Sequence, residues 1–328
     1  MRLVVGSVKR AWLLRLAIAV FLAAVPWLVT SPYHMHIINL VGLYTLITLG
    51  LNILSGYTGQ VSMGQAGFMA VGAYTCALLM LRLNMPFWPS VLAGVLLAVV
   101  CGLAFGIPAM KLRGPYLVMA TVGFGEIVRL VLVNWVPVTR GAAGLTGIPV
   151  PTFVGLRVSD ERRFFYLVVA LVAVGVAAAL RLSASKIGRA LVAIREDDVA
   201  AEAMGVPVNV YKVAAFAISA AYAGLAGAMY GPFTSVASPD SFTFDDSVGY
   251  LCMSVVGGNR GVWGALVGAF ALTVLSELLR PFQSYRLIIY GLILICTVVF
   301  LPQGVTGLVM GLIRRWRRGS RGVRGERE

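Results

Sequence analysis

Ten apolar runs occupy most of the sequence, and they constrain the fold more than any other feature does. A helix needs about 20 mostly apolar residues to cross a bilayer, and nine of the runs come close to that length or exceed it. The fold class predicted is therefore all-α, a polytopic membrane protein of about ten transmembrane segments. One of them, at 243–257, is short or re-entrant. The runs lie at 11–30, 36–54, 62–81, 87–110, 115–136, 164–182, 211–233, 243–257, 261–280 and 285–301.

The overall composition supports this prediction and excludes several other classes of protein. Hydrophobic residues make up 59% of the chain and charged residues 12%. An ordinary soluble domain is about 45–50% apolar and about 25% charged. The balance excludes a soluble globular enzyme, a disordered chain and a disulfide-stapled secreted domain. The net charge of +14 would suggest nucleic acid in a soluble protein, but here it fits basic loops beside a membrane, and no nucleic-acid partner is expected.

The basic residues predict the orientation of the chain. If all ten runs cross and the N-terminus is inside, most of the 27 Lys and Arg residues fall in cytoplasmic segments. If the short run did not cross, the arginine-rich C-terminal tail would lie outside, against the positive-inside rule. We therefore predict that both termini are cytoplasmic. Residues 1–313 are expected to form a single transmembrane domain, and 314–328 a basic tail held near anionic lipid headgroups.

The longest predicted inner loop, 183–210, has the pattern of two short helices with an apolar side. Gly188 is expected to open the first helix, and Gly205 can end the second in the left-handed conformation. A solvated connector would not need an apolar side, so we interpret this loop as a docking element for a soluble partner. A turn on the membrane surface is the alternative. The candidate contact residues are Gly188, Arg189, Ile194, Arg195, Glu196, Asp197, Asp198, Met204 and Gly205.

Glycines and polar residues crowd together at 56–72, inside an apolar region. Irregular polar backbone at membrane depth is tolerated where it lines a cavity, so the cluster predicts part of a translocation path. Three GxxxG pairs elsewhere favour plain helix packing, in which small residues let helices approach closely. The pairs are Gly102/Gly106, Gly227/Gly231 and Gly264/Gly268.

Two acidic residues lie within apolar runs, each three residues before an arginine. Glu126 precedes Arg129 in the middle of its run, and Glu277 precedes Arg280 near the outer end of another. An ionisable residue inside a membrane is a functional candidate by default. A self-neutralising pair that fixes packing is the alternative for Glu126, and an interfacial ion pair is expected for Glu277.

No catalytic motif is present in the sequence. It contains no GxxxxGK[ST] nucleotide site, no HExxH and no GxSxG, and its four cysteines are isolated in apolar stretches. We therefore expect no catalytic residue, no metal site and no cofactor on this chain, and a transport role in place of an enzymatic one.

Long motifs resemble the permeases of bacterial branched-chain amino acid ABC transporters, of the LivM type. The resemblance covers about 40 to 308, in order. Its main segments are LNILSGYTGQVSMGQAGFMAVGAYTCALL (51–79), KLRGPYLVMATVGFGEIVRLVL (111–132), RGAAGLTGIP (140–149), GRALVAIREDDVAAEAMGV (188–206), SPDSFTFDDSVGYLCMSVVGGNRGVWGALVGA (238–269) and LIIYGLILICTVVFLPQGVTGL (287–308).

The resemblance implies a complex in the bacterial inner membrane. It implies a second, LivH-type permease, two cytoplasmic ATPases that carry ATP and Mg, and a periplasmic substrate-binding protein. Loop 188–206 would press into the ATPases, and the substrate would be a branched-chain or related amino acid. The candidate path residues are Gly59, Gln60, Ser62, Gly64, Gln65, Thr121, Phe124 and Glu126.

Two alternatives to this function stay open from the sequence. The first is a permease of the same family for urea, amides or other small solutes. The second is an ion-coupled secondary transporter that uses Glu126 as a proton carrier. The secondary transporter would work without an ATPase, and the docking loop argues against it.

Overall fold

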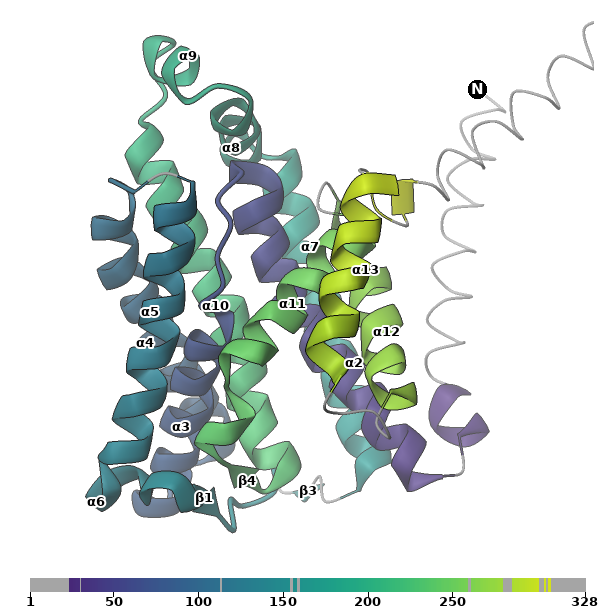
Figure 1. Ribbon diagram of the computed structural model, residues 1–328. Helices are drawn as coiled ribbons and strands as arrows, with labels where there is room; N and C mark the ends of the chain where they lie inside the picture. Colours follow the sequence, from purple (N-terminus) through teal and green to yellow (C-terminus); the bar gives the residue numbers. More distant parts are fainter. Residues whose placement is uncertain are drawn as a thin grey trace, which may run out of the picture.

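The computed structural model shows a bundle of long helices (Figure 1). It describes 24–29, 31–112, 114–153, 156–157, 160–258, 261–279, 285–300, 304 and 306–307. Most of the first apolar run, the basic N-terminal segment and the tail at 314–328 lie outside the described residues, as do Arg260 and Arg280.

Each of the nine apolar runs after the first forms a helix, as predicted. Five of these helices are long and apolar enough to cross a membrane: α2 with its continuation η1, α4, α5, α7 and α10. This confirms an all-α protein with several membrane-spanning helices. The helices are α2 (Pro32–Leu51), the π-helix η1 (Asn52–Tyr57), α3 (Gln65–Arg82), α4 (Phe87–Ala109), α5 (Pro115–Asn134), α7 (Glu161–Ala184), α10 (Val208–Thr234), α11 (Phe244–Gly257), α12 (Val262–Leu278) and α13 (Arg286–Phe300).

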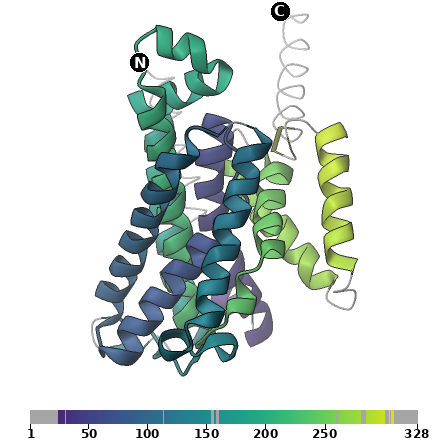
Figure 2. The ribbon, with the colours of Figure 1, turned by 60° about the vertical axis from the view of Figure 1, so that its left-hand side comes forward.

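Short elements gather at the two ends of the bundle. Helices α8 (Lys186–Glu196) and α9 (Asp198–Ala203) lie at the top of Figures 1 and 2, and the strands β1, β3 and β4 lie at the bottom of Figure 1. The predicted docking loop therefore lies at the opposite end from 137–163, the longest loop predicted on the other side of the membrane, which we call the outer loop. The remaining elements are α6 (Val136–Thr139), η2 (Gly141–Ala143), β1 (Leu145–Thr146), β2 (Thr152–Phe153), β3 (Leu156–Arg157), β4 (Val236–Ala237) and η3 (Pro239–Ser241).

The outer loop is joined to the end of α10 by a small antiparallel sheet. Strand β1 pairs with β4 so that Leu145 lies opposite Ala237, and both side chains are buried. Gly144, with φ +68°, approaches so closely that an added Cβ would lie 2.4 Å from the carbonyl oxygen of Ala237. Strands β2 and β3 form a separate hairpin. The sheet fixes the outer loop over the bundle.

Helix α10 lies at the centre of the bundle and packs through small residues on α3 and α4. A Cβ added to Gly227 would lie 1.9 Å from the carbonyl oxygen of Met69, and one added to Gly102 would lie 2.6 Å from the Cβ of Ala220. A Cβ on Gly268 would meet the Met253 carbonyl oxygen at 1.8 Å. One glycine of each GxxxG pair therefore lets two helices approach closely, as predicted for helix packing.

Candidate functional site

The chain leaves the helical conformation between η1 and α3. Gly59 has φ +74°, which favours glycine, and the backbone is irregular from there until α3 begins at Gln65. In Figure 1 this stretch descends from the upper end of η1, beside α8, to the start of α3. The predicted polar cluster is therefore an irregular segment, 59–64, inside the bundle.

Polar groups from three other helices bond this segment and the start of α3. The Met63 N–H donates to Thr121 Oγ1 of α5 at 3.0 Å, and the Ala66 N–H donates to Ser247 Oγ of α11 at 3.1 Å. A side-chain bond from Gln65 Nε2 to Ser219 Oγ of α10 measures 2.9 Å. Because a helix start leaves N–H groups without intrahelical partners, these hydroxyls supply acceptors that lipid cannot.

Glycines let segment 59–64 and α3 approach α5 closely. A Cβ on Gly64 would lie 2.7 Å from the carbonyl oxygen of Thr121, and one on Gly67 would lie 3.0 Å from Gly125 Cα. The predicted path residues from 59–64 and from α5 therefore meet, although they are far apart in sequence. Phe124 packs beside them against Phe68, with ring centroids 4.6 Å apart.

Most of the predicted path residues are buried. The structure buries Gln60, Ser62, Gly64, Gln65 and Thr121, and it leaves Gly59 exposed.

Two separate cavities lie along these residues. The inner cavity has about 300 Å³ and is lined by Gly59, Gln60, Arg195 and Lys212 among others. The second has about 10 Å³ and lies beside Glu126, so it is roughly the size of one water. The space beside Glu126 is therefore narrow in this structure.

Glu126 forms an ion pair with Arg129 on its own helix. Arg129 Nη2 lies 2.7 Å from Glu126 Oε1, and Nε lies 3.0 Å from the same oxygen. The two side chains keep 42% and 30% of their surface exposed, Glu126 the larger share. The Glu126–Arg129 pair is present, as the sequence predicted.

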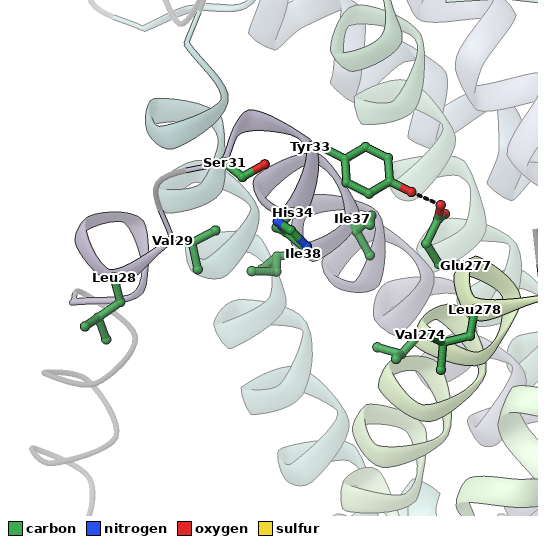
Figure 3. A pocket seen from close by; sticks show the side chains of 10 residues that line it. All are labelled: Leu28, Val29, Ser31, Tyr33, His34, Ile37, Ile38, Val274, Glu277 and Leu278. Atoms are coloured by element: carbon green, nitrogen blue, oxygen red, sulfur yellow. Dashed lines mark hydrogen bonds between the residues drawn. The ribbon is translucent and has the colours of Figure 1, made fainter.

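Glu277 of α12 contacts the start of α2. Figure 3 shows Tyr33 of α2 pointing at Glu277 of α12, whose carboxylate accepts a hydrogen bond from the tyrosine hydroxyl. Arg280 lies outside the described residues. The contact lies at the edge of a cavity of about 760 Å³ between α2 and α12.

The predicted docking loop folds as two capped helices. Ser185 Oγ accepts from the Gly188 N–H at 3.2 Å, so α8 begins at Lys186, two residues earlier than expected. Asp197 Oδ1 caps α9 by accepting from the N–H of Val199 at 2.9 Å. Gly205 follows α9 with φ +83°, in the left-handed conformation that the sequence predicted.

The apolar side of α8 faces the bundle. Leu191 and Ile194 are each 1% exposed, and Leu191 packs with Leu54, Leu117 and Phe216. Gly188 is also buried, since a Cβ there would lie 2.3 Å from the Leu182 carbonyl oxygen. Gly188 and Ile194 are thus turned toward their own chain, a correction to the surface predicted for a partner.

A different set of residues on α8 and α9 is accessible from outside. Arg189, Glu196, Asp197, Met204 and Gly205 of the predicted set are exposed. Apolar side chains join them, and Met204 has 85% of its surface exposed. The other large apolar residues exposed on these two helices are Ile187, Val192 and Val199.

Two side chains bind the predicted docking loop to the membrane helices. Arg195 Nη1 donates to the backbone carbonyl of Gly56 in η1, and its Cγ would lie 3.4 Å from a Cβ on Gly59. Lys212 at the start of α10 forms an ion pair with Asp198 of α9. The predicted path and the predicted docking loop therefore meet at the inner cavity.

Sequence analysis missed three residues of this arrangement. Ser219 and Ser247 supply hydroxyls to the start of α3, and Lys212 anchors α9. The available signal was a serine inside each of the apolar runs 211–233 and 243–257. Within the described ranges, no three His, Cys, Asp or Glu residues come together as metal ligands would.

Comparison with known proteins identifies the family. The family model for the permease component of branched-chain amino acid transport systems matches residues 33–298. The LivM permease protein of the high-affinity branched-chain amino acid transport system of Escherichia coli K12 is 35% identical, over 92% of this chain and 76% of that protein. The corresponding LivH protein of the same organism is 23% identical, over 80% of this chain and 91% of that protein. No solved structure matches. The chain therefore belongs to the family of permease components of branched-chain amino acid transport systems.

Proposed function

We propose that this chain is one permease half of an ATP-driven importer that moves branched-chain amino acids into the bacterial cytoplasm. It would sit in the inner membrane with about ten crossings and both termini inside. A LivH-type permease, two ATPases that hold ATP and Mg, and a periplasmic binding protein would complete the transporter. The family supports this assembly, and the exposed face of α8 and α9 supports the contact with the ATPases.

The observation that carries the proposal is the bond from Arg195 to the Gly56 carbonyl. It connects α8, whose outer face is accessible, to η1, which leads directly into the irregular segment 59–64. A ligand or partner shifts an equilibrium only through contacts that differ between two states. ATP-driven movement of α8 would change this contact and so reach the backbone at the path.

The path would follow segment 59–64 and the adjoining face of α5. Hydroxyls of Thr121, Ser219 and Ser247 and the amide of Gln65 provide its polar groups. The cavity of about 10 Å³ at Glu126 would have to widen during transport, because it has room for about one water. Movement of α5 away from segment 59–64 would do this.

The experiment is solute uptake by cells that carry this permease as the sole importer of its kind, together with its partner subunits. Labelled leucine, isoleucine and valine are compared with labelled urea and an amide. ATP depletion should abolish leucine uptake, and a proton ionophore with ATP maintained should leave it. Uptake of urea but not of leucine would show that the proposed substrate is wrong. Uptake driven by a proton gradient without the ATPases would show that the protein is a secondary transporter.

A further inference from the structure

One line of α5 side chains has no covering partner among the described residues. Six exposed positions recur every three or four residues, so they lie on one side of the helix, and the exposed Pro115 and Val131 adjoin them. In the most apolar stretch of α5, 17% of the residues are buried, the lowest share among the five long apolar helices. We call these residues the α5 stripe: Tyr116, Met119, Gly123, Ile127, Leu130 and Asn134.

A small residue lies at the middle of the stripe. A Cβ added to Gly123 would meet no described atom within 4 Å. Packing within the described part of the chain therefore does not require glycine there, in contrast to Gly64 or Gly67. Glycine in a membrane helix lets another helix come close, which gives Gly123 a purpose outside this chain.

Charge lies beside the stripe at membrane depth. Glu126 is one turn from both Gly123 and Leu130, and it and Arg129 are 42% and 30% exposed. A charged side chain at the centre of a membrane helix is costly when it faces lipid. The ion pair reduces this cost, but partly exposed charges favour a face covered by protein.

The neighbouring helix α4 has an exposed face of a different kind. Its exposed large residues are Leu92, Leu96, Leu97, Val100, Leu103 and Ile107, all aliphatic. Such a face fits hydrocarbon without any partner. The contrast assigns lipid to α4 and a protein to the α5 stripe.

We propose that the α5 stripe is the surface on which a second permease of the same family packs, with Gly123 at the point of closest approach. The inference rests on the proposed function and specifies which face of the chain meets its partner. The family contains two related kinds of permease, since both LivM and LivH proteins match this chain. A homologous partner would bring a membrane helix with a small residue opposite Gly123 and a hydrogen-bonding side chain near Arg129.

Photo-crosslinking tests the surface directly. The photoreactive residue p-benzoylphenylalanine replaces Ile127 on the stripe, or Leu96 on α4, in cells that make the complete transporter. We expect an adduct from Ile127 whose second component is a homologous permease by mass spectrometry, and no such adduct from Leu96. An adduct from Ile127 to a second copy of this chain, to its own N-terminal segment or to lipid alone would overturn the proposal, as would the reverse pattern.

A substitution pair gives a second, independent test. Gly123→Leu should lower co-purification of the second permease by about tenfold or more, a change of about 1.4 kcal/mol, with membrane level and thermal stability of this chain unchanged. Gly291→Leu on α13 is the matched control, because a Cβ at Gly291 also meets no described atom within 4 Å. Equal co-purification of both variants at the wild-type level would overturn the proposal.

These readouts are separate from the substrate. An adduct with a homologous permease in cells that take up urea would leave the α5 surface in place and refute the branched-chain substrate. Leucine uptake driven by ATP, together with an adduct only from Leu96, would support the proposed function and refute the α5 surface.

Discussion

Arg195 of α8 donates a hydrogen bond to the backbone carbonyl of Gly56 in η1. A π-helix is uncommon and is often found at functional sites. Here it ends one residue before Thr58, and the irregular segment 59–64 follows. Ser62, Gly64 and the nearby Gln65 are buried under α5, α10 and α11. The bond therefore places a side chain of the docking loop at the start of the proposed path.

Arg195→Ala should impair coupling while leaving the transporter assembled. The variant loses a charged donor to Gly56, a hydrogen bond of the class worth about 1.5–3 kcal/mol. We expect ATP-driven uptake to fall by about tenfold or more, with the ATPases still co-purifying. Arg195→Glu should be at least as severe. Uptake at the wild-type rate in both variants would refute the link.

Arg189→Ala is the matched comparison on the same helix. Its guanidinium is exposed and donates to the Ala184 carbonyl at 3.1 Å, close by in the sequence. We expect this variant to lower ATPase co-purification, because Arg189 belongs to the outer face of α8. If Arg189→Ala and Arg195→Ala lose the ATPases equally, Arg195 has no separate internal role.

Ser219→Ala should destabilise the protein, because it leaves the buried amide of Gln65 without its acceptor. Both side chains are 0% exposed, and an unsatisfied buried polar group costs about 1–3 kcal/mol. Thermal unfolding in detergent should show a lowered Tm. Ser183→Ala is the control, since Ser183 bonds a carbonyl of its own helix, that of Leu180.

A double-mutant cycle then isolates the contact. Gln65→Leu combined with Ser219→Ala should cost less than the sum of the two single changes, because the double variant leaves neither partner unsatisfied. Additive effects on Tm would show that the 2.9 Å bond does not contribute to stability.

Gly227→Ala should sharply reduce the yield of folded protein. Its Cβ would lie 1.9 Å from the Met69 carbonyl oxygen, so α3 and α10 would have to separate. Overpacking of this kind costs about 1–3 kcal/mol or more. Gly231→Ala, in the same GxxxG pair, meets its nearest atom at 3.4 Å and should behave like the wild type in monodispersity on size-exclusion chromatography.

Glu126→Gln alone should impair assembly or transport, since it leaves the Arg129 charge unpaired on α5. Adding Arg129→Gln removes the second charge. If the pair serves packing, the double variant should recover stability and a large part of the uptake. If Glu126 carries protons, the double variant should be stable but inactive, and uptake should depend on the proton gradient. The measurements are thermal stability and uptake in the same preparations.

The apolar runs predicted most of the fold because membrane helices depend on a property that is local in sequence. Nine runs became helices, and the run at 243–257 became the short helix α11. Helix ends were also local, as Asp197 and Gly205 show. The start of α8 differs from the predicted one at Gly188, because Ser185 caps the helix and its first residue is Lys186.

The sequence did not predict which neighbour covers each side of a helix. The sequence predicted an apolar side on loop 183–210 and assigned it to a partner, but Leu191 and Ile194 on that side pack on the chain's own helices. Periodicity reveals that a helix has an apolar side, and it is silent on what covers it. Arg195 was likewise predicted at an external contact, and its guanidinium lies on Gly56.

By itself the sequence determined the class of protein, the helices, the family and the two segments of interest. Tertiary structure alone decided that those segments meet, because the hydroxyls of Thr121, Ser219 and Ser247 come from helices distant in the chain. It also decided that the large residues exposed on α4 are all aliphatic, while α5 exposes Gly123 beside an ion pair. Burial is a property of the packed bundle, so no single helix encodes which of its sides remains free.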